Sequence, residues 1–228
     1  MINMHENKLI EKDNKYYIES NGKLEKVAIF TDHYYSLKPW NGIPLLEIDG
    51  IRMHLVKDYS NPLQYAKEVI KTIKFAGREI VFDTCCGLGY WAIEESKYAK
   101  KVICCELKKE VLKLAKQNPF SKDLFNNDKI DLKNKSCFDY IKTIDKESID
   151  IVMHDPPTIL IANELYSLDF YKQVFRVLKP KGIFFHYIGQ VGINKGRRFD
   201  SEMIKKLNEA NFKDCKYYEK LQAIICKK

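Results

Sequence analysis

An acid and two glycines stand close together in the stretch DTCCGLGY, residues 83–90, directly after an apolar run. Gly87 and Gly89 allow the backbone to turn sharply and to approach a ligand closely. The carboxylate of Asp83 would repel a pyrophosphate and would attract a nucleoside that carries a positive charge. The glycines also fit G-x-G-x-x-A through Ala92, a spacing that dinucleotide-binding folds share. The stretch therefore predicts a nucleotide site, and its acid favours a cationic nucleoside.

A second acid, Glu106, ends the next apolar run, 17 positions after Gly89. A carboxylate there can accept hydrogen bonds from both ribose hydroxyls of an adenosine. Both an NAD-type cofactor and S-adenosylmethionine would use it, but Asp83 favours the second, because that cofactor carries an ammonium group beside its adenosine. At the next predicted strand end, Ser136 and Cys137 can supply a side chain and a backbone N–H to the adenine edge.

A third group of candidate residues follows the apolar run at 149–155, in the stretch IDIVMHDPPT. Proline fixes φ and has no N–H to donate, so Asp155 and the carbonyl of Pro156 form a rigid pair of acceptors. Such a pair can orient an amine and take a proton from it as the amine reacts. His154 can shuttle a proton, or strand alternation can turn it into the core. We predict that Asp155, Pro156 and His154 are catalytic.

Alternating strands and helices must position these residues. Buried strands are predicted at 79–84, 101–106, 129–134, 149–155 and 182–189, with helices at 90–98, 108–117, 165–178 and 200–210. Such repeated units imply a parallel sheet that is covered on both faces. A further helix is capped by Ser60 or Asn61, has Pro62 at its first position and ends at Gly77. The C-terminal stretch predicts two strands joined by a tight turn at 219–220.

The chain before these units has a different pattern. Residues 1–60 alternate polar and apolar positions in short runs separated by turn signals, which is typical of β-strands. We therefore predict a small β-rich N-terminal module at 1–60 and a cofactor-binding domain at 61–228. With 228 residues, 45% hydrophobic and 31% charged, the chain is long enough for one substantial core and its composition excludes a disordered protein.

The net charge and the cysteine content indicate which partners and ligands the protein can bind. The net charge of +8 would attract an anionic partner such as RNA, and the basic stretch NKGRR at 194–198 can contact phosphates, although a lysine-rich composition alone often gives such a charge. The seven cysteines fit neither a zinc knuckle nor a disulfide framework, so we predict reduced thiols and no metal site. The apolar runs are too short to span a membrane and the N-terminus lacks a signal peptide's apolar region, which predicts a cytoplasmic protein.

From about Leu45 onward, the chain resembles the class I S-adenosylmethionine-dependent methyltransferases, because DTCCGLGY, CCE, MHDPP, FRVLKPKGIFFHY and the closing strand pair follow in that family's order. Within the class it is most similar to an archaeal-type, spermidine-synthase-like group, with LEIDGIRMH, NPFS and HDPPT among the matching stretches. The resemblance implies a doubly wound, seven-stranded Rossmann-like sheet whose last strand is antiparallel, and S-adenosylmethionine as the cofactor. The predicted cofactor-binding residues are Asp83, Thr84, Cys85, Gly87, Gly89, Tyr90, Glu106, Leu107, Ser136, Cys137 and Asp155.

The resemblance also has departures. Aminopropyltransferases usually carry two acids around the fourth strand's end, whereas this chain has Asp155 and places Val152 three residues before it. Enzymes that methylate base amines typically have an aromatic residue after D-P-P, where this chain has Thr158, although Tyr166 or Phe170 can stack from the next helix. The leading hypothesis is methyl transfer to an amine or another nucleophile of RNA, protein or a small molecule. The alternatives are an aminopropyltransferase-like polyamine enzyme, an NAD-dependent oxidoreductase and a non-catalytic RNA-binding module.

Overall fold

The computed structural model describes residues 8–54, 58–189 and 199–228. The basic stretch at 194–198, a candidate phosphate contact, lies outside these ranges. Seven strands form one sheet in the order β10-β9-β8-β11-β12-β14-β13. The strands β10, β9, β8, β11 and β12 are parallel to one another, and β14 is antiparallel to both of its neighbours, β12 and β13. This order confirms the predicted doubly wound sheet and puts its switch point between β8 and β11, where ligands bind in such folds.

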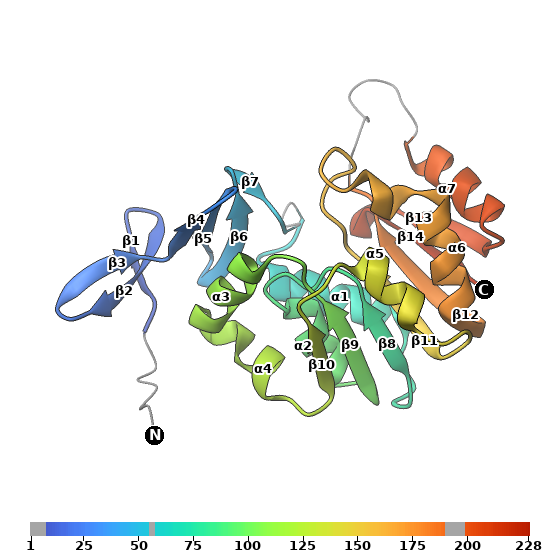
Figure 1. Cartoon of the computed structure of the whole chain (residues 1–228), viewed down its shortest axis with the longest axis horizontal. Coiled ribbons are helices and arrows are strands. Elements are labelled where there is room, and N and C mark those ends of the chain that lie inside the picture. The colour runs from blue at the N-terminus through green and yellow to red at the C-terminus, as the bar shows by residue number, and fades with distance from the viewer. Residues whose placement is uncertain (1–7, 55–57, 190–198) are drawn as a thin grey trace.

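The predicted strands and helices all occur, with ends that differ by a few residues (Figure 1). The strands of the central sheet are β8 (Ile80–Asp83), β9 (Lys101–Cys105), β10 (Ile130–Lys133), β11 (Ile149–His154), β12 (Leu178–Tyr187), β13 (Lys213–Tyr218) and β14 (Ala223–Lys227). The helices are α1 (Pro62–Ile73), α2 (Tyr90–Ser96), α3 (Lys109–Gln117), α4 (Lys122–Asn126), α5 (Cys137–Tyr140), α6 (Leu168–Val177) and α7 (Phe199–Glu209). Short 3-10 turns are η1 (Pro119–Ser121), η2 (Ile141–Thr143), η3 (Asn163–Tyr166) and η5 (Glu219–Leu221).

Helix α1 shows how local chemistry sets an element's ends. The side chain of Asn61 accepts a hydrogen bond from the Gln64 N–H, and Pro62 takes the first helical position, as predicted. The helix ends at Ile73 and not at Gly77, because Lys74 adopts a left-handed conformation with φ 60° and its N–H closes the last turn on the Ile70 carbonyl.

The N-terminal module consists of two antiparallel sheets. The first contains β1 (Ile10–Lys12), β2 (Lys15–Ser20) and β3 (Lys23–Lys26), and the second contains β4 (Ala28–Phe30), β5 (Tyr34–Trp40), β6 (Ile43–Ile48) and β7 (Ile51–Arg52). Figure 1 shows the first sheet extending away from the rest of the chain, while the second lies beside α3. Buried side chains of β5 and β6, such as Tyr35 and Leu46, join the core that α1, α2 and α3 share.

Two layers of apolar side chains cover the central sheet, because successive residues of a strand point to opposite faces. Val81, Met153 and Phe185 pack on the face that α1, α2 and α3 cover. Phe82 and Phe184 pack on the other face, with α6 and α7. All seven cysteines are free thiols, and five of them are buried. Within the described ranges, no helix has the length and apolar character needed to cross a bilayer.

Candidate active site

The two glycines of the turn between β8 and α2 have different surroundings. Both have a positive φ, 55° at Gly87 and 82° at Gly89. A Cβ on Gly89 would lie 2.7 Å from Cδ2 of Leu124, so this position is closed by packing. A Cβ on Gly87 would meet no atom within 4 Å. The turn is therefore packed against α4 at Gly89 and open to a ligand at Gly87.

Asp83 and Glu106 both accept hydrogen bonds from backbone N–H groups of this turn. One carboxyl oxygen of Asp83 accepts from the Cys85 N–H at 3.3 Å, and the other is buried without a hydrogen-bond partner. Glu106 accepts from the N–H groups of Gly87 at 3.0 Å and Lys108 at 2.8 Å. Burial raises the pKa of Asp83 to about 7, and the charge of Glu106 adds to that shift. Asp83 therefore caps the turn with one oxygen, and its other oxygen has no partner among the described residues.

Asp155 follows the end of β11, the strand next to β8. Burial raises the pKa of its half-buried carboxyl to about 8, and the charge of Asp83 adds to the shift. Across the residues that the structure describes, no lysine or arginine contributes to either pKa. Asp83 and Asp155, the rim carboxyls, thus form an acidic pair that no cation of the described ranges offsets, and such a pair disfavours ionisation of both carboxyls until a positive charge arrives.

His154 is the last residue of β11, and its ring packs against Phe170 of α6 and Phe184 of β12. Its ring is fully buried, with Nε2 3.1 Å from the Leu165 carbonyl and Nδ1 2.6 Å from Oγ1 of Thr84. Because a carbonyl can only accept, Nε2 carries the proton and Nδ1 accepts from the threonine hydroxyl. Burial lowers the pKa of His154 to about 3, so the ring is neutral. This placement favours the packing alternative over the predicted proton shuttle.

Some of the other predicted cofactor-binding residues are exposed, whereas others already form hydrogen bonds within the protein. Cys85 and Cys137 come together, because the Cys137 thiol is hydrogen-bonded to Cys85 and raises the pKa of that thiol. Leu107 is 60% exposed beside Glu106 and is free to contact a ligand. The residues whose side chains are already occupied within the protein are Thr84, which bonds to His154, and Tyr90, whose hydroxyl donates to the Pro44 carbonyl at 2.6 Å. The hydroxyl groups of these two residues are therefore engaged within the protein, and the Thr84 N–H also donates to the Met153 carbonyl at 3.0 Å.

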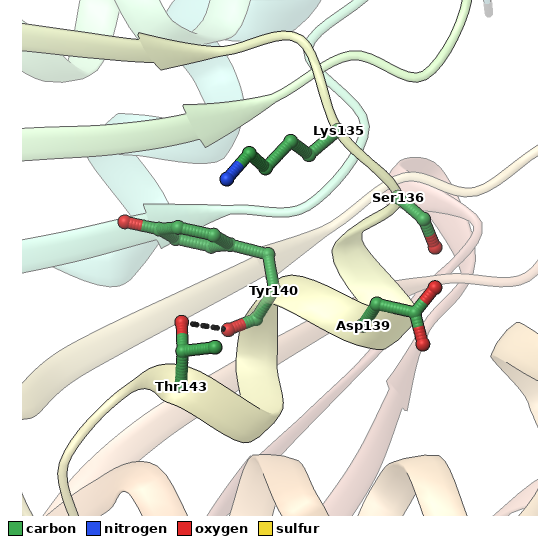
Figure 2. A pocket seen from close by; sticks show the side chains of 5 residues that line it. All are labelled: Lys135, Ser136, Asp139, Tyr140 and Thr143. Carbon is green, nitrogen blue, oxygen red and sulfur yellow. Dashed lines mark hydrogen bonds between the residues drawn. The ribbon is translucent and has the colours of Figure 1, made fainter.

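A cavity of about 320 Å³ lies beside α5 and is lined by Lys135, Ser136, Asp139, Tyr140 and Thr143. Figure 2 shows the side chains of Ser136 and Asp139 pointing to one side of the helix and those of Lys135 and Tyr140 to the other. The cavity shares only Ser136 with the predicted cofactor site. It therefore borders the adenine side of the site without reaching the glycine turn or Asp155.

The charge of Asp155 affects three tyrosines. Burial, followed by the negative charge of Asp155, raises the pKa of Tyr65, Tyr166 and Tyr187. Their hydroxyl groups donate to the Leu221 carbonyl at 2.9 Å, the Pro157 carbonyl at 3.0 Å and Oε1 of Gln222 at 3.4 Å. Tyr65 was not identified from the sequence, because on α1 it resembles any core tyrosine. Phe170, a candidate stacking residue, is fully buried against His154.

Known proteins resemble this chain in sequence and in fold. Residues 76–221 match the spermine/spermidine synthase domain family. The uncharacterized protein MJ1233 of Methanocaldococcus jannaschii is 38% identical over 222 residues, which are 97% of this chain and 76% of that protein.

Two solved structures share the fold at low sequence identity. A spermidine synthase in complex with the transition-state analogue AdoDATO has a TM-score of 0.69 and 14% identity, over 88% of this chain and 72% of that one. The spermidine synthase from Thermotoga maritima has a TM-score of 0.63 and 18% identity, over 83% of this chain and 67% of that one. The match covers more than half of the chain, including both rim carboxyls and Glu106, and the chain therefore belongs to the spermine/spermidine synthase domain family.

Proposed function

We propose that this chain is an S-adenosylmethionine-dependent transferase that moves a methyl group to an amine or another nucleophile held at Asp155. The observation that carries the proposal is the pair of rim carboxyls, which lie at adjacent strand ends and whose pKa values no lysine or arginine of the described residues affects. Two neighbouring carboxyls, one buried and one half-buried, do not both ionise readily unless a positive charge joins them, and a sulfonium nucleoside brings that charge. An NAD-type cofactor would bring phosphates, which this pair repels.

The residues present fit such a cofactor. The negative charge of an ionised Asp83 would attract an ammonium group, and a Cβ on Gly87 would meet no atom within 4 Å. Glu106 and Leu107 stand at the next strand end, where a ribose and an adenine would lie. Asp83, Gly87, Glu106 and Leu107 would hold the cofactor, which supplies an activated carbon on a positively charged sulfur.

Asp155 and Pro156 would act on the acceptor. The bound cofactor would supply a methyl carbon whose leaving group is a neutral thioether, and an amine that accepts this methyl group would have one proton to lose. Asp155 takes that proton, for which a pKa of about 8 makes it a suitable base near neutral pH. Pro156 has no N–H, so its carbonyl serves only as an acceptor that orients the amine.

A second candidate is aminopropyl transfer, which the family match and the fold shared with spermidine synthases favour. The same rim carboxyls would serve a decarboxylated nucleoside equally well, because it is also a sulfonium. Against this candidate, β11 brings one acid to the site, Asp155. Val152, three residues before it, is fully buried in the core on the side of α6 and α7. The second acid usual in aminopropyltransferases is thus replaced by a core residue.

One assay separates these functions. The protein is incubated with S-adenosylmethionine labelled in its methyl group, or with decarboxylated S-adenosylmethionine labelled in its aminopropyl group, and with RNA, protein and small-amine fractions of a cell extract. We expect methyl label in one fraction, which identifies the acceptor class, and none with Asp155→Asn. Transfer of aminopropyl label alone would establish the second candidate. If calorimetry detects binding of neither nucleoside nor S-adenosylhomocysteine, both candidates are wrong.

A further inference from the structure

The NPFS segment, residues 118–121, lies between α3 and α4 and takes no part in the proposed chemistry. Asn118 is 2% exposed and Ser121 is fully buried. The amide of Asn118 donates to the Tyr90 hydroxyl at 2.9 Å and to Oγ of Ser121 at 2.8 Å. Its side-chain oxygen accepts from the Phe120 N–H at 3.2 Å. Every polar atom of this buried amide therefore has a partner inside the protein.

The hydrogen bonds of this segment end on both sides of Gly89. The Ser121 hydroxyl donates to the Leu88 carbonyl at 2.6 Å, and the Tyr90 hydroxyl donates onward to the Pro44 carbonyl of β6 at 2.6 Å. Leu124, which follows in α4, fills the space that a side chain at Gly89 would need. The residues before and after Gly89 are thus tied to the NPFS segment, and Gly89 itself is closed in by α4.

We propose that the NPFS segment is the positioning element of the glycine turn, with Asn118 as its central residue, and that it links the turn to the N-terminal module through Tyr90 and Pro44. The inference rests on the proposed function, because it takes the turn to be a cofactor site. Helix α2 has no side-chain cap at Gly89, so its own sequence does not fix where the turn ends. The hydrogen bonds from Asn118 to the Tyr90 hydroxyl and from Ser121 to the Leu88 carbonyl fix that position instead.

A matched pair of variants tests the proposal. Asn118→Ala removes the contacts at the start of α2, whereas Asn127→Ala removes a hydrogen bond of the same kind, at 3.0 Å, to Oγ of Ser96 at the end of α2. Amide hydrogen exchange of Gly89, whose N–H donates to the Cys86 carbonyl at 2.7 Å, is followed in the ligand-free proteins. The dissociation constant of S-adenosylhomocysteine is measured by calorimetry. We expect Asn118→Ala to speed the exchange and to raise the dissociation constant about tenfold, and Asn127→Ala to change neither.

The outcomes separate the two proposals. Equal exchange rates and equal affinities in the two variants would overturn the positioning role. A wild-type protein that does not bind the nucleoside, while the exchange rates differ as expected, would overturn the proposed function and leave the positioning role in place. If Asn118→Ala does not fold, Tyr90→Phe removes only one hydroxyl, and we expect the same changes at roughly threefold in affinity. No change in Tyr90→Phe would then decide against the proposal.

Discussion

The two sides of the glycine turn differ in whether their polar and charged groups have partners within the protein. On the side of the NPFS segment, the amide of Asn118 and the hydroxyl of Ser121 are both satisfied at distances of 2.6–3.2 Å. On the side of the rim carboxyls, Asp83 keeps a buried oxygen without a partner, and Asp155 has no cation among the described residues. A saturated network makes the backbone rigid, whereas an unsatisfied pair is stabilised only by an incoming charge. This difference supports both proposals, in which one side holds the turn and the other binds the ligand.

The largest effect is expected from the ligand side. Asp155→Asn keeps the size of the residue but removes the proton acceptor, so we expect the rate of label transfer to fall by about 10²–10⁴-fold. The control is Asp150→Asn, at the other end of β11, where the carboxylate is paired with Lys179 at 2.8 Å. We expect that control to retain its rate. A rate loss of similar size in both variants would show that β11 tolerates no such change and would remove Asp155 from the mechanism.

Glu106→Ala should have the next largest effect. The carboxylate holds the N–H groups of Gly87 and Lys108 and is predicted to accept from the ribose, so we expect a rise of about 10–100-fold in the dissociation constant of S-adenosylhomocysteine. Glu79 offers a control, because it also accepts from two backbone N–H groups, those of Ala76 and Arg78, before the start of β8. Equal affinity in wild type and Glu106→Ala would contradict the assignment of Glu106 to the cofactor.

The affinity for S-adenosylmethionine should also depend on pH. The pKa is about 7 for Asp83 and about 8 for Asp155, and a bound cation favours their ionised forms, so binding releases protons. The affinity should therefore rise from pH 6 to pH 8, by at most about tenfold per pH unit for each proton released, and level off above. Calorimetry in buffers of different ionisation enthalpy measures the protons directly.

Variants on the two sides should respond differently to pH. Asp83→Asn should flatten the pH profile, whereas Asn118→Ala should lower the affinity by the same factor at every pH, because Asn118 does not titrate. A pH-independent affinity in the wild type would show that the rim carboxyls do not meet the cation. The side of the turn with the rim carboxyls would then be no more sensitive to charge than the side of the NPFS segment.

The sequence predicted the strand ends of the site better than its side-chain directions. Asp83, Glu106 and Asp155 each follow an apolar run, and parallel strands bring such ends to one edge of a sheet, so their meeting could be expected. The direction of a side chain depends on strand alternation and on neighbours far along the chain. His154 turns into the core and Tyr90 turns toward Pro44 for that reason.

The parts that could not be predicted depend on contacts between distant segments. The charge of Asp155 affects Tyr65 of α1 because the Tyr65 ring packs against Tyr187 of β12 and its hydroxyl donates to the Leu221 carbonyl. The NPFS stretch was identified as part of a resemblance, but nothing in its four letters shows that Asn118 points to Tyr90, 28 positions earlier. Hydrogen bonds of this kind are visible only once the fold is known.

The smallest expected effect is that of Asp155→Asn on the free energy of unfolding. This substitution should lower the rate of transfer but raise the stability of the ligand-free protein at high pH. The folded-state pKa of Asp155 is about 8, well above the value near 3.9 of an unfolded chain, so the folded state holds an extra proton between these values. Stability should therefore be greatest at the low end of this window and fall as the pH rises from about 4 to about 8.

Asp155→Asn removes this loss, so the melting temperature of the ligand-free variant at pH 8 should exceed that of the wild type. We expect a difference of a few degrees, since ~1 kcal/mol corresponds to about 2–4 °C at this chain length. The difference should shrink at pH 5, where the wild-type carboxyl is protonated. Asp150→Asn, which breaks the ion pair with Lys179, should lower the melting temperature instead. A lower melting temperature for Asp155→Asn at pH 8 would mean that the folded protein already stabilises this carboxylate, and the rim carboxyls would then need no cationic ligand.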